Sequence, residues 1–347
     1  MSVTSPAPRE VWRELLDQDS EALITQSPTW LDCICHNGSF VDASRLYEFS
    51  GGQRVVIPLA RRTLPTWVAE EGSWPFDWGI GGPVSPGGIV TAEEARLVFE
   101  DLARRPALRT YVRFRPRACP AWQEGASGGR FSTIDQTAYV LDLGEGFGHV
   151  WANRFHASVR RAVRKAERSD IKVEVDHSGR LLPTFYQLYE RSIARWAEQQ
   201  HEPLALSRWR ARRANPPDKL ATVADRFGGA FATWVAWVAD QPAAAILVLR
   251  QGAQVKYWRG AMDKELASPV RANDLLHRLV IEDAIAAGCQ YYHMGDAREG
   301  SSLARFKEGF GAVGYGCRGY RRERLPVSST ADHLRMGVKR LVGFRDA

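Results

Sequence analysis

The stretch 296–312 holds the residues whose types and spacing best suggest chemistry. Lys307 lies between Phe306 and Phe310, and Leu303 extends these apolar residues along the spacing of one helix face. An apolar run just before the stretch predicts a buried strand that ends on a glycine. A lysine at such a strand-to-helix junction can direct its ammonium into a cleft with little water, where it would stabilise negative charge that develops in a reaction.

Lys307 also has a structural interpretation. A surface helix can carry a lysine in the same pattern, with the aliphatic stem over apolar neighbours and the ammonium in water. The local pattern does not decide between the two, so the catalytic role depends on the rest of the sequence.

A second candidate region is the loop-rich segment 73–84. It places Trp74, Asp77 and Trp78 among glycines and prolines, which cannot form regular structure for long. Glycine lets the backbone approach a ligand closely, so the segment could form the wall of a substrate-binding cleft. The alternative is a structural loop that its two tryptophans anchor in the core.

The third candidate is a basic helix that begins near Trp151. Its apolar stripe faces a surface with six basic residues and one acid, whereas a solvated helix face usually mixes the two signs. Such a surface could bind phosphates, and a solvated basic face without a ligand is the alternative. The residues assigned to this contact are Arg160, Arg161, Arg164 and Lys165.

Composition narrows the class of protein. A length of 347 residues suggests two domains, and a net charge of +7 with a pI of 9.3 favours a polyanionic partner. We see no apolar run long enough for a transmembrane helix and no signal peptide, and the five scattered cysteines suggest reduced thiols. We therefore expect a cytoplasmic protein. We expect no metal site either, because Cys33 and Cys35 are too close together for zinc.

Periodicity predicts the elements that must position these residues. In the first half we expect a β-hairpin at 46–59, a helix at 91–103 started by Thr91, and strands at 111–115 and 137–143. In the second half, strands and helices follow the order of an acyltransferase fold. We expect helices at 182–198, 272–287 and 333–342, strands at 171–175, 231–239, 243–250, 254–261, 289–295 and 315–324, and an irregular segment at 201–217. The fold class is α/β (α+β), with domains at 1–148 and 149–328.

Taken together, four stretches resemble the Fem family of non-ribosomal peptidyl transferases. The stretches are 156–166, 185–196, 257–261 and 295–312, and the last is the most specific because it resembles the family's F-K-x-x-F-G signature. The resemblance implies two tandem GNAT-like domains, each a mixed, mostly antiparallel sheet flanked by helices. It also suggests that the end of the chain, 329–347, packs on the first domain.

The resemblance implies aminoacyl transfer from aminoacyl-tRNA to an amine of a peptide-like acceptor, either a peptidoglycan precursor or a peptide natural product. Lys307 matches the family lysine thought to stabilise charge at the reacting ester, and Phe306 accompanies it. The donor is a substrate, so no cofactor is implied. Four residues in or beside the similar stretches are assigned to substrate binding, and they are Arg195, Tyr257, Arg259 and Asp296.

Two other functions remain open. An acyl-coenzyme A-dependent N-acyltransferase of the same fold would hold pyrophosphate on a glycine-containing loop, but 266–274 lacks both glycines. A non-catalytic nucleic-acid-binding protein would use the basic helix alone, yet no helix-turn-helix or zinc-finger signature is present. The sequence also lacks the sustained heptads of the coiled-coil arm found in some Fem proteins, and no set of residues identifies the acceptor.

Overall fold

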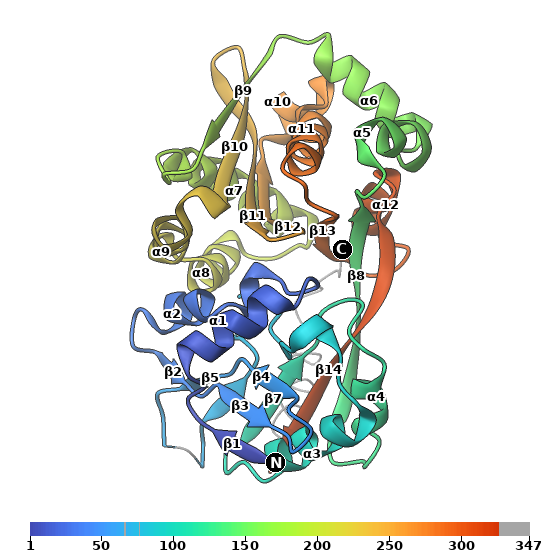
Figure 1. The fold of residues 1–347 in the computed structure, drawn as a ribbon. Helices are drawn as coiled ribbons and strands as arrows, with labels where there is room; N and C mark the ends of the chain where they lie inside the picture. The colour runs from blue at the N-terminus through green and yellow to red at the C-terminus, as the bar shows by residue number, and fades with distance from the viewer. Residues whose placement is uncertain (66, 76, 326–347) are drawn as a thin grey trace. The chain divides into compact units, whose positions relative to one another are not determined.

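The structure is a computed structural model that describes residues 1–65, 67–75 and 77–325. The chain folds into two compact units (Figure 1). Unit 1 comprises Met1–Gly144, Arg250–Lys256 and Gly288–Arg324, whereas unit 2 consists mainly of Glu145–Leu249 and Tyr257–Ala287. Both units contain strands and helices, and the chain is of the predicted α/β class with a large mixed sheet.

The units divide the chain differently from the predicted domains. The first boundary falls after Gly144, close to the predicted end at 148, but Gly288–Arg324 groups with unit 1. The reason is hydrogen bonding, because two late strands, β13 (Tyr291–Asp296) and β14 (Val313–Glu323), both pair with β8 (Ser132–Asp142) of the first half. Lys307 therefore belongs to unit 1. The segment 329–347, with its predicted helix, lies outside the described residues.

Unit 1 contains a small antiparallel sheet of three strands near the N-terminus. Its strand order is β1-β3-β4, with β1 at Ser2–Thr4, β3 at Arg45–Glu48 and β4 at Arg54–Ile57. In the β3–β4 pair, Arg45 lies opposite Ile57 and Glu48 lies opposite Arg54. This pairing confirms the hairpin predicted at 46–59.

The larger sheet of unit 1 positions the candidate lysine. Its strand order is β2-β5-β6-β7-β14-β8-β13-β12, and only the β6–β7 and β13–β12 pairs are parallel. The strands are β2 (Phe40–Asp42), β5 (Ala60–Arg62), β6 (Glu70–Gly72), β7 (Arg109–Arg113), β8 (Ser132–Asp142), β12 (Gln254–Met262), β13 (Tyr291–Asp296) and β14 (Val313–Glu323). The first three residues of β12 belong to unit 1 and the others to unit 2.

Helices of unit 1 pack on these strands. They are α1 (Arg9–Gln18), α2 (Pro28–Cys35), α3 (Ala92–Ala103), α4 (Ala121–Gly125) and α12 (Ser302–Gly309), with short 3₁₀ turns at Ile24–Gln26 and Pro86–Gly88. Helix α3 begins as predicted, since the Thr91 hydroxyl accepts a hydrogen bond from the Glu94 N–H at 3.2 Å and the Glu94 carboxylate accepts one from the Thr91 N–H at 2.8 Å.

The core of unit 1 is rich in aromatic rings. The ring of Phe99, on α3, lies 4.9 Å from Tyr320 and 6.0 Å from Phe114, and Phe114 meets Trp122 of α4 edge to face at 5.1 Å. All four side chains are buried. Aromatic contacts of this kind add stability to that gained from the buried area. This core therefore stabilises one end of the sheet, and the Lys307 site lies at the other end.

Unit 2 contains the strand order β12-β11-β10-β9, in which β10 pairs antiparallel with both β11 and β9. Its strands are β9 (Ile171–Asp176), β10 (Phe231–Val238), β11 (Gln241–Gln251) and the second part of β12. Its helices are α5 (Gly146–His149), α6 (Ala157–Glu167), α7 (Leu182–Gln199), α8 (Leu204–Ala214), α9 (Pro217–Phe227), α10 (Lys264–Val270) and α11 (Ala272–Ala286), with a π turn at Val150–Arg154 and a 3₁₀ turn at Gly228–Ala230. In the part of the chain that the structure describes, no helix is long and apolar enough to cross a bilayer.

Two local predictions for unit 2 were wrong. The stripe that starts at Trp151 is not one helix, because Phe155 and His156 have extended backbones between the π turn and α6. The segment predicted to be irregular at 201–217 contains α8. Only Ser207 is buried on that helix, so the sequence carries no apolar stripe by which to recognise it.

Candidate active site

Lys307 is a buried lysine near the C-terminal end of α12. Ser301 caps this helix by accepting a hydrogen bond from the Ala304 N–H at 3.1 Å. The lysine side chain is 3% exposed, and its Nζ donates to the carbonyl oxygens of Gly295 at 2.9 Å and Asp296 at 2.6 Å. The ammonium therefore lies at the end of β13 and not in bulk water, which excludes the interpretation of a lysine that snorkels from a surface helix.

The end of β13 is shaped to receive this ammonium. The pairing of β13 with β8 is irregular between His293 and Gly295, and Gly295 adopts a left-handed φ of 75°. Residues other than glycine rarely take that conformation. Both carbonyls that accept from Lys307 follow this irregularity, so the glycine is needed for the local path of the backbone.

Burial changes the acidity of Lys307. Removal from water lowers its pKa to about 8, helped by the nearby Lys256 ammonium and opposed by the Asp296 carboxylate. A pKa of about 8 leaves the amine mostly protonated at neutral pH. The side chain can therefore act as a fixed cation in neutral solution and loses its charge as the pH rises through about 8.

Neighbouring groups hold the lysine without neutralising it directly. The Asp296 carboxylate pairs with Arg113 at 2.6 Å, so its backbone oxygen and not its side chain accepts from Lys307. The Lys307 Nζ also lies 5.7 Å from the ring centre of Tyr139, whose hydroxyl donates to Glu308 at 3.2 Å. An aromatic face stabilises a nearby cation, so this contact favours the charged lysine.

The other residues of the motif separate into buried and exposed positions. Phe310 is fully buried and meets the half-buried Phe306 edge to face at 5.3 Å. Leu303 is 49% exposed, so it does not belong to the apolar face predicted from its spacing. The buried residues of α12 are instead Ala304, Lys307 and Gly309, because the helix turns its small residues and its lysine toward β8.

Three polar residues beside this site, His293, Gln254 and Lys256, were not predicted from the sequence. His293 is buried on β13, and its Nε2 lies 2.7 Å from the Gln254 Oε1. The Gln254 amide donates to the Ser20 carbonyl at 2.8 Å, which leaves Oε1 as acceptor and makes His293 Nε2 the donor. Burial and the nearby cation of Lys256 lower the His293 pKa to about 3, so this histidine is neutral and a weak base. The only sequence signal was polar residues within otherwise apolar strands.

The segment 73–84 packs within unit 1. Trp74 is buried, and its indole N–H donates to the Thr25 carbonyl at 2.7 Å. Trp78 is half-buried and meets Trp30 edge to face at 5.7 Å, and Asp77 adopts a left-handed φ of 68°. Trp74 therefore anchors the loop in the core, as the structural alternative predicts. Asp77 and Trp78 retain exposed surface.

Three residues assigned to substrate binding lie in unit 2. Arg195, on α7, donates to the Met262 carbonyl at 3.1 Å. Arg259 donates to the Asn215 Oδ1 at 3.2 and 3.3 Å. Tyr257 packs against His277 with 4.8 Å between ring centres, and burial raises its pKa to about 12. All three are therefore positioned by the backbone or side chains of their own unit.

The Tyr257 hydroxyl also lies over Gly260. A Cβ at that glycine would come within 2.1 Å of the hydroxyl oxygen, which is closer than nonbonded atoms can approach. Glycine at 260 therefore permits the position of the Tyr257 ring.

The basic residues of α6 do not form one uniform surface. Arg160 is half-buried, and its Nη1 donates to the carbonyls of Ala152 at 2.9 Å and Phe155 at 2.5 Å, which closes the turn before the helix. Arg161, Arg164 and Lys165 are exposed. Of the four residues predicted to contact RNA, these three therefore present their charge to solvent.

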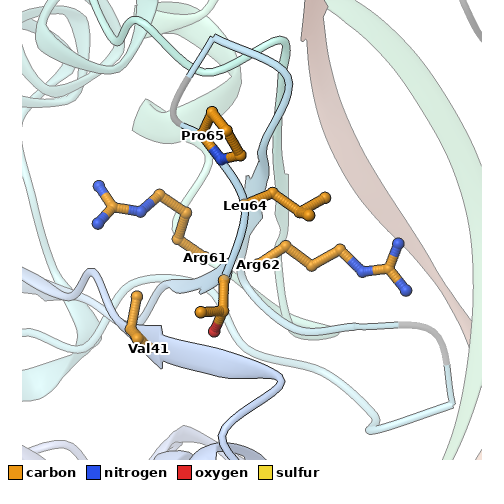
Figure 2. Close-up of a pocket in the computed structure, with 6 residues that line it drawn as sticks. Val41, Arg61, Arg62, Leu64 and Pro65 are labelled. Carbon is orange, nitrogen blue, oxygen red and sulfur yellow. The ribbon is translucent and has the colours of Figure 1, made fainter.

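Two cavities in unit 1 lie apart from these residues. One, of about 290 Å³, is lined by Val41 and the segment 61–65, and Figure 2 shows the guanidinium groups of Arg61 and Arg62 extending to opposite sides. Those two charges do not converge on one ligand. The other, of about 540 Å³, lies between the segment 114–123 and strands β8 and β14. Among the described residues, no group of three or more His, Cys, Asp or Glu side chains is arranged to hold a metal ion.

Comparison with known proteins adds to this geometry. Residues 153–308 match the family model of the acetyltransferase (GNAT) domain, a match that ends one residue after Lys307. The structure resembles the crystal structure of FemX with a TM-score of 0.66 and 11% identity, over 92% of this chain and 97% of that chain. The chain has the fold of FemX. No curated protein sequence matches this one significantly.

Two further structures share the FemX-like fold. L-PGS from Bacillus licheniformis aligns with a TM-score of 0.54 and 13% identity, over 98% of both chains. A tandem GNAT protein from the clavulanic acid biosynthesis pathway aligns at 0.50 and 12% identity, over 93% of this chain and 98% of that chain. These similarities confirm the tandem GNAT-like architecture. The match to the acetyltransferase domain model supports an acyltransferase.

Proposed function

We propose that this protein transfers an amino acid from aminoacyl-tRNA to an amine of a peptide-like acceptor. The observation that carries the proposal is the buried, protonated Lys307, held by two backbone carbonyls at the end of β13. A cation in a poorly hydrated position is suited to a reaction that develops negative charge on an oxygen. Attack of an amine on an ester is such a reaction.

The proposed chemistry balances without a cofactor. The acceptor amine attacks the ester carbonyl carbon, and the carbonyl oxygen becomes an oxyanion that Lys307 stabilises. When the tetrahedral intermediate collapses, the bond from carbon to the ribose oxygen breaks and an amide bond remains. The amine loses a proton and the departing ribose oxygen gains one, so the RNA sugar can serve in this transfer. His293, with a pKa of about 3, is too weak a base for that role.

The donor would be recognised in part by α6. Arg161, Arg164 and Lys165 present exposed positive charge on one helix, as phosphate binding requires. Arg160 is assigned a structural part in this proposal, because its guanidinium holds the turn that precedes the helix. The RNA contact then depends on three cations of α6.

The acceptor would be a peptidoglycan precursor or a peptide natural product. Asp77, Trp78 and Asp296 in unit 1, and Arg195, Tyr257 and Arg259 in unit 2, are proposed to bind substrate, and Phe306 to shield the reacting ester from water. The likeness to FemX and to L-PGS supports aminoacyl transfer over other acyl transfers. Both substrates are made inside cells, so we propose that the protein acts in the cytoplasm.

An acyl-coenzyme A donor is the second candidate, favoured by the acetyltransferase family model that matches 153–308. The start of α11 argues against it. Asp274 lies in the first turn of that helix, where the backbone N–H groups would otherwise bind a pyrophosphate. A carboxylate there competes with the phosphate for those groups. Burial raises the pKa of this carboxyl.

Incubation with labelled substrates distinguishes these functions. We expect the purified protein to release label from a radiolabelled aminoacyl-tRNA when a peptide-like amine is present, and to leave labelled acetyl-coenzyme A intact. Lys307→Ala should slow the release at least about a hundredfold and keep the RNA bound. Consumption of acetyl-coenzyme A would favour the second candidate, and RNA binding without loss of label from any aminoacyl-tRNA would indicate a nucleic-acid-binding protein.

A further inference from the structure

The cationic face of α6 extends beyond the three residues assigned to RNA. Arg168, which directly follows the helix, is also exposed. Residues three and four positions apart share one face of a helix, so the exposed cations form one contiguous surface, made of Arg161, Arg164, Lys165 and Arg168. Among the described residues, none of these four side chains forms an ion pair, and the one acid of the helix, Glu167, lies 3.9 Å from Arg278 instead. The positive charge of this face therefore remains available to a ligand.

Two half-buried aromatic rings lie beside the cationic face. Trp151, in the π turn, and Phe147, on α5, have 6.2 Å between their ring centres. The Arg164 guanidinium lies 5.8 Å from the Trp151 ring centre, and that of Arg278 lies 5.0 Å from the Phe147 ring centre. All four residues belong to unit 2, in which α11 packs on both α5 and α6 (Figure 1). A partly exposed tryptophan ring therefore adjoins the cations of α6.

Trp151 is held in position from the protein side. Its ring centre lies 5.7 Å from that of the buried Phe155, and its carbonyl accepts a hydrogen bond from Arg160 at 3.3 Å. The indole N–H groups of Trp12 and Trp74 donate to backbone carbonyls, as buried tryptophans usually do. Within the described part of the chain, the Trp151 indole N–H has no such acceptor. The ring is therefore fixed on one side and open to a ligand on the other.

We propose that this surface binds an unpaired segment of RNA, with a base stacked on Trp151 and phosphates on the cations of α6. Positive charge beside exposed aromatic rings is the combination by which proteins hold single-stranded nucleic acid. A duplex would meet the same cations through its phosphates. Its bases, however, are already stacked on one another and are not available to the ring. Trp151 therefore favours unpaired RNA over a duplex.

The choice of RNA as ligand rests on the proposed function, and the Trp151 contact adds the form of RNA that is bound. Binding through Trp151 requires no transfer, so it is measured separately. A protein that binds unpaired RNA through Trp151 but transfers no amino acid would refute the proposed function alone. Transfer by a protein whose RNA affinity is independent of Trp151 would refute the stacking contact alone.

Fluorescence anisotropy compares the two forms of RNA on the full-length protein. The probe is an unstructured, labelled RNA of roughly 12 nucleotides, within the usual size of a single-strand site. Its duplex with the complementary strand is measured at the same salt. We expect the single strand to bind at least about tenfold more tightly, although the duplex carries twice as many phosphates. A surface that acts through charge alone would bind the duplex at least as tightly, and that result would overturn the proposal.

Substitutions of Trp151 test the stacking contact. Trp151→Leu should weaken single-strand binding roughly tenfold, as loss of one stacked base does, and should leave duplex binding unchanged. Trp151→Phe should retain most of the affinity, because it keeps an aromatic ring. Circular dichroism and thermal unfolding establish that the variants are folded, and the preference of the unchanged protein for the single strand needs no variant.

Trp209 provides a matched control in the same unit. It is 56% exposed on α8, and the Arg213 guanidinium lies 5.5 Å from its ring centre. The arginines on either side of Trp209 are paired with Glu190 and Glu202, so this tryptophan lacks a face of unpaired cations. Trp209→Leu should therefore bind the single strand as the unchanged protein does. Equal affinity in Trp151→Leu and the unchanged protein would overturn the proposal, as would an equal loss in Trp209→Leu.

Discussion

Two cationic regions of this chain carry the proposed reaction, and they differ in their contact with water. Lys307 is 3% exposed and makes two hydrogen bonds to backbone carbonyls, whereas Arg161, Arg164 and Lys165 of α6 are exposed. Burial fixes the position of the first charge, and although it lowers the pKa to about 8, the amine stays mostly protonated at neutral pH, as stabilisation of an oxyanion requires. Exposure leaves the α6 charges free to exchange counterions, which is what reversible RNA binding requires.

Removing the buried charge should have the largest effect. We expect Lys307→Ala to lower the transfer rate by at least about a hundredfold, as loss of one oxyanion-stabilising group typically does, with little change in RNA affinity. Steady-state rates and filter binding measure the two quantities. Arg305→Ala is the matched control, because it removes an exposed cation from the same helix and should leave the rate unchanged. An unaffected rate in Lys307→Ala would remove the catalytic assignment.

Removing the exposed charges should change binding and not chemistry. We expect the combined change of Arg161, Arg164 and Lys165 to glutamine to weaken RNA binding. The slope of log affinity against log salt should fall by about 2 to 3, since each lost phosphate contact contributes roughly 0.7–0.9. The rate at saturating RNA should persist. Lys172, Arg180 and Lys264 are exposed cations elsewhere in unit 2, and their triple glutamine variant serves as control. If both triples give the same slope, α6 is not the RNA surface.

A change in the backbone at Gly295 tests the positioning of Lys307 while the lysine itself is retained. Gly295→Ala should destabilise the fold by about 1–2 kcal/mol, because an L-residue is strained at a φ of 75°. It should also slow transfer, since relief of the strain moves the two carbonyls that hold Lys307. Gly52→Ala imposes the same strain at a φ of 84° in an open turn. Urea unfolding should show similar losses for both, and a rate loss confined to Gly295→Ala would support the positioning role.

The smallest expected effect is a shift in pH dependence. The Asp296 carboxylate raises the pKa of Lys307, so Asp296→Asn should lower it below about 8. The charged, active form is then lost at a lower pH, and the descending limb of the rate profile should move to lower pH by a fraction of a unit. The pH dependence of RNA binding to α6 should be unchanged. A limb that stays in place, or moves upward, would argue against Lys307 as the group that titrates.

Local signals in the sequence predicted much of the fold. The capping box at Thr91 and the hairpin at 46–59 are correct because side chains within a few residues determine them. The tandem GNAT-like architecture followed from the resemblance and is confirmed by the fold. The grouping of Gly288–Arg324 with unit 1 is a long-range property, which depends on the pairing of β13 and β14 with β8.

The candidate site was harder to predict from residue spacing. Leu303 has the spacing of an apolar face but lies in solvent, whereas Ala304 and Lys307 are turned inward. Helix α8 was missed because its apolar residues face outward, so the rule that apolar residues mark the packed side does not apply to it. His293 and Gln254 gave no motif, since their contact joins two strands distant in sequence.

The ion pair between Arg113 and Asp296 has a consequence for how this lysine stays active. Asp296 supplies one of the two carbonyls that accept from the Lys307 ammonium, and Arg113 pairs with its carboxylate. With Arg113 replaced by leucine, we expect the Asp296 side chain to rotate and pair its carboxylate with the Lys307 ammonium. The lysine would keep its position, but its charge would no longer be available to stabilise an oxyanion. A rise in the Lys307 pKa, followed by nitrogen NMR across a pH titration, would reveal that quenching. We therefore expect the Arg113–Asp296 ion pair to keep the carboxylate away from Lys307, so that the reactivity of the lysine depends on a pair in which it takes no part.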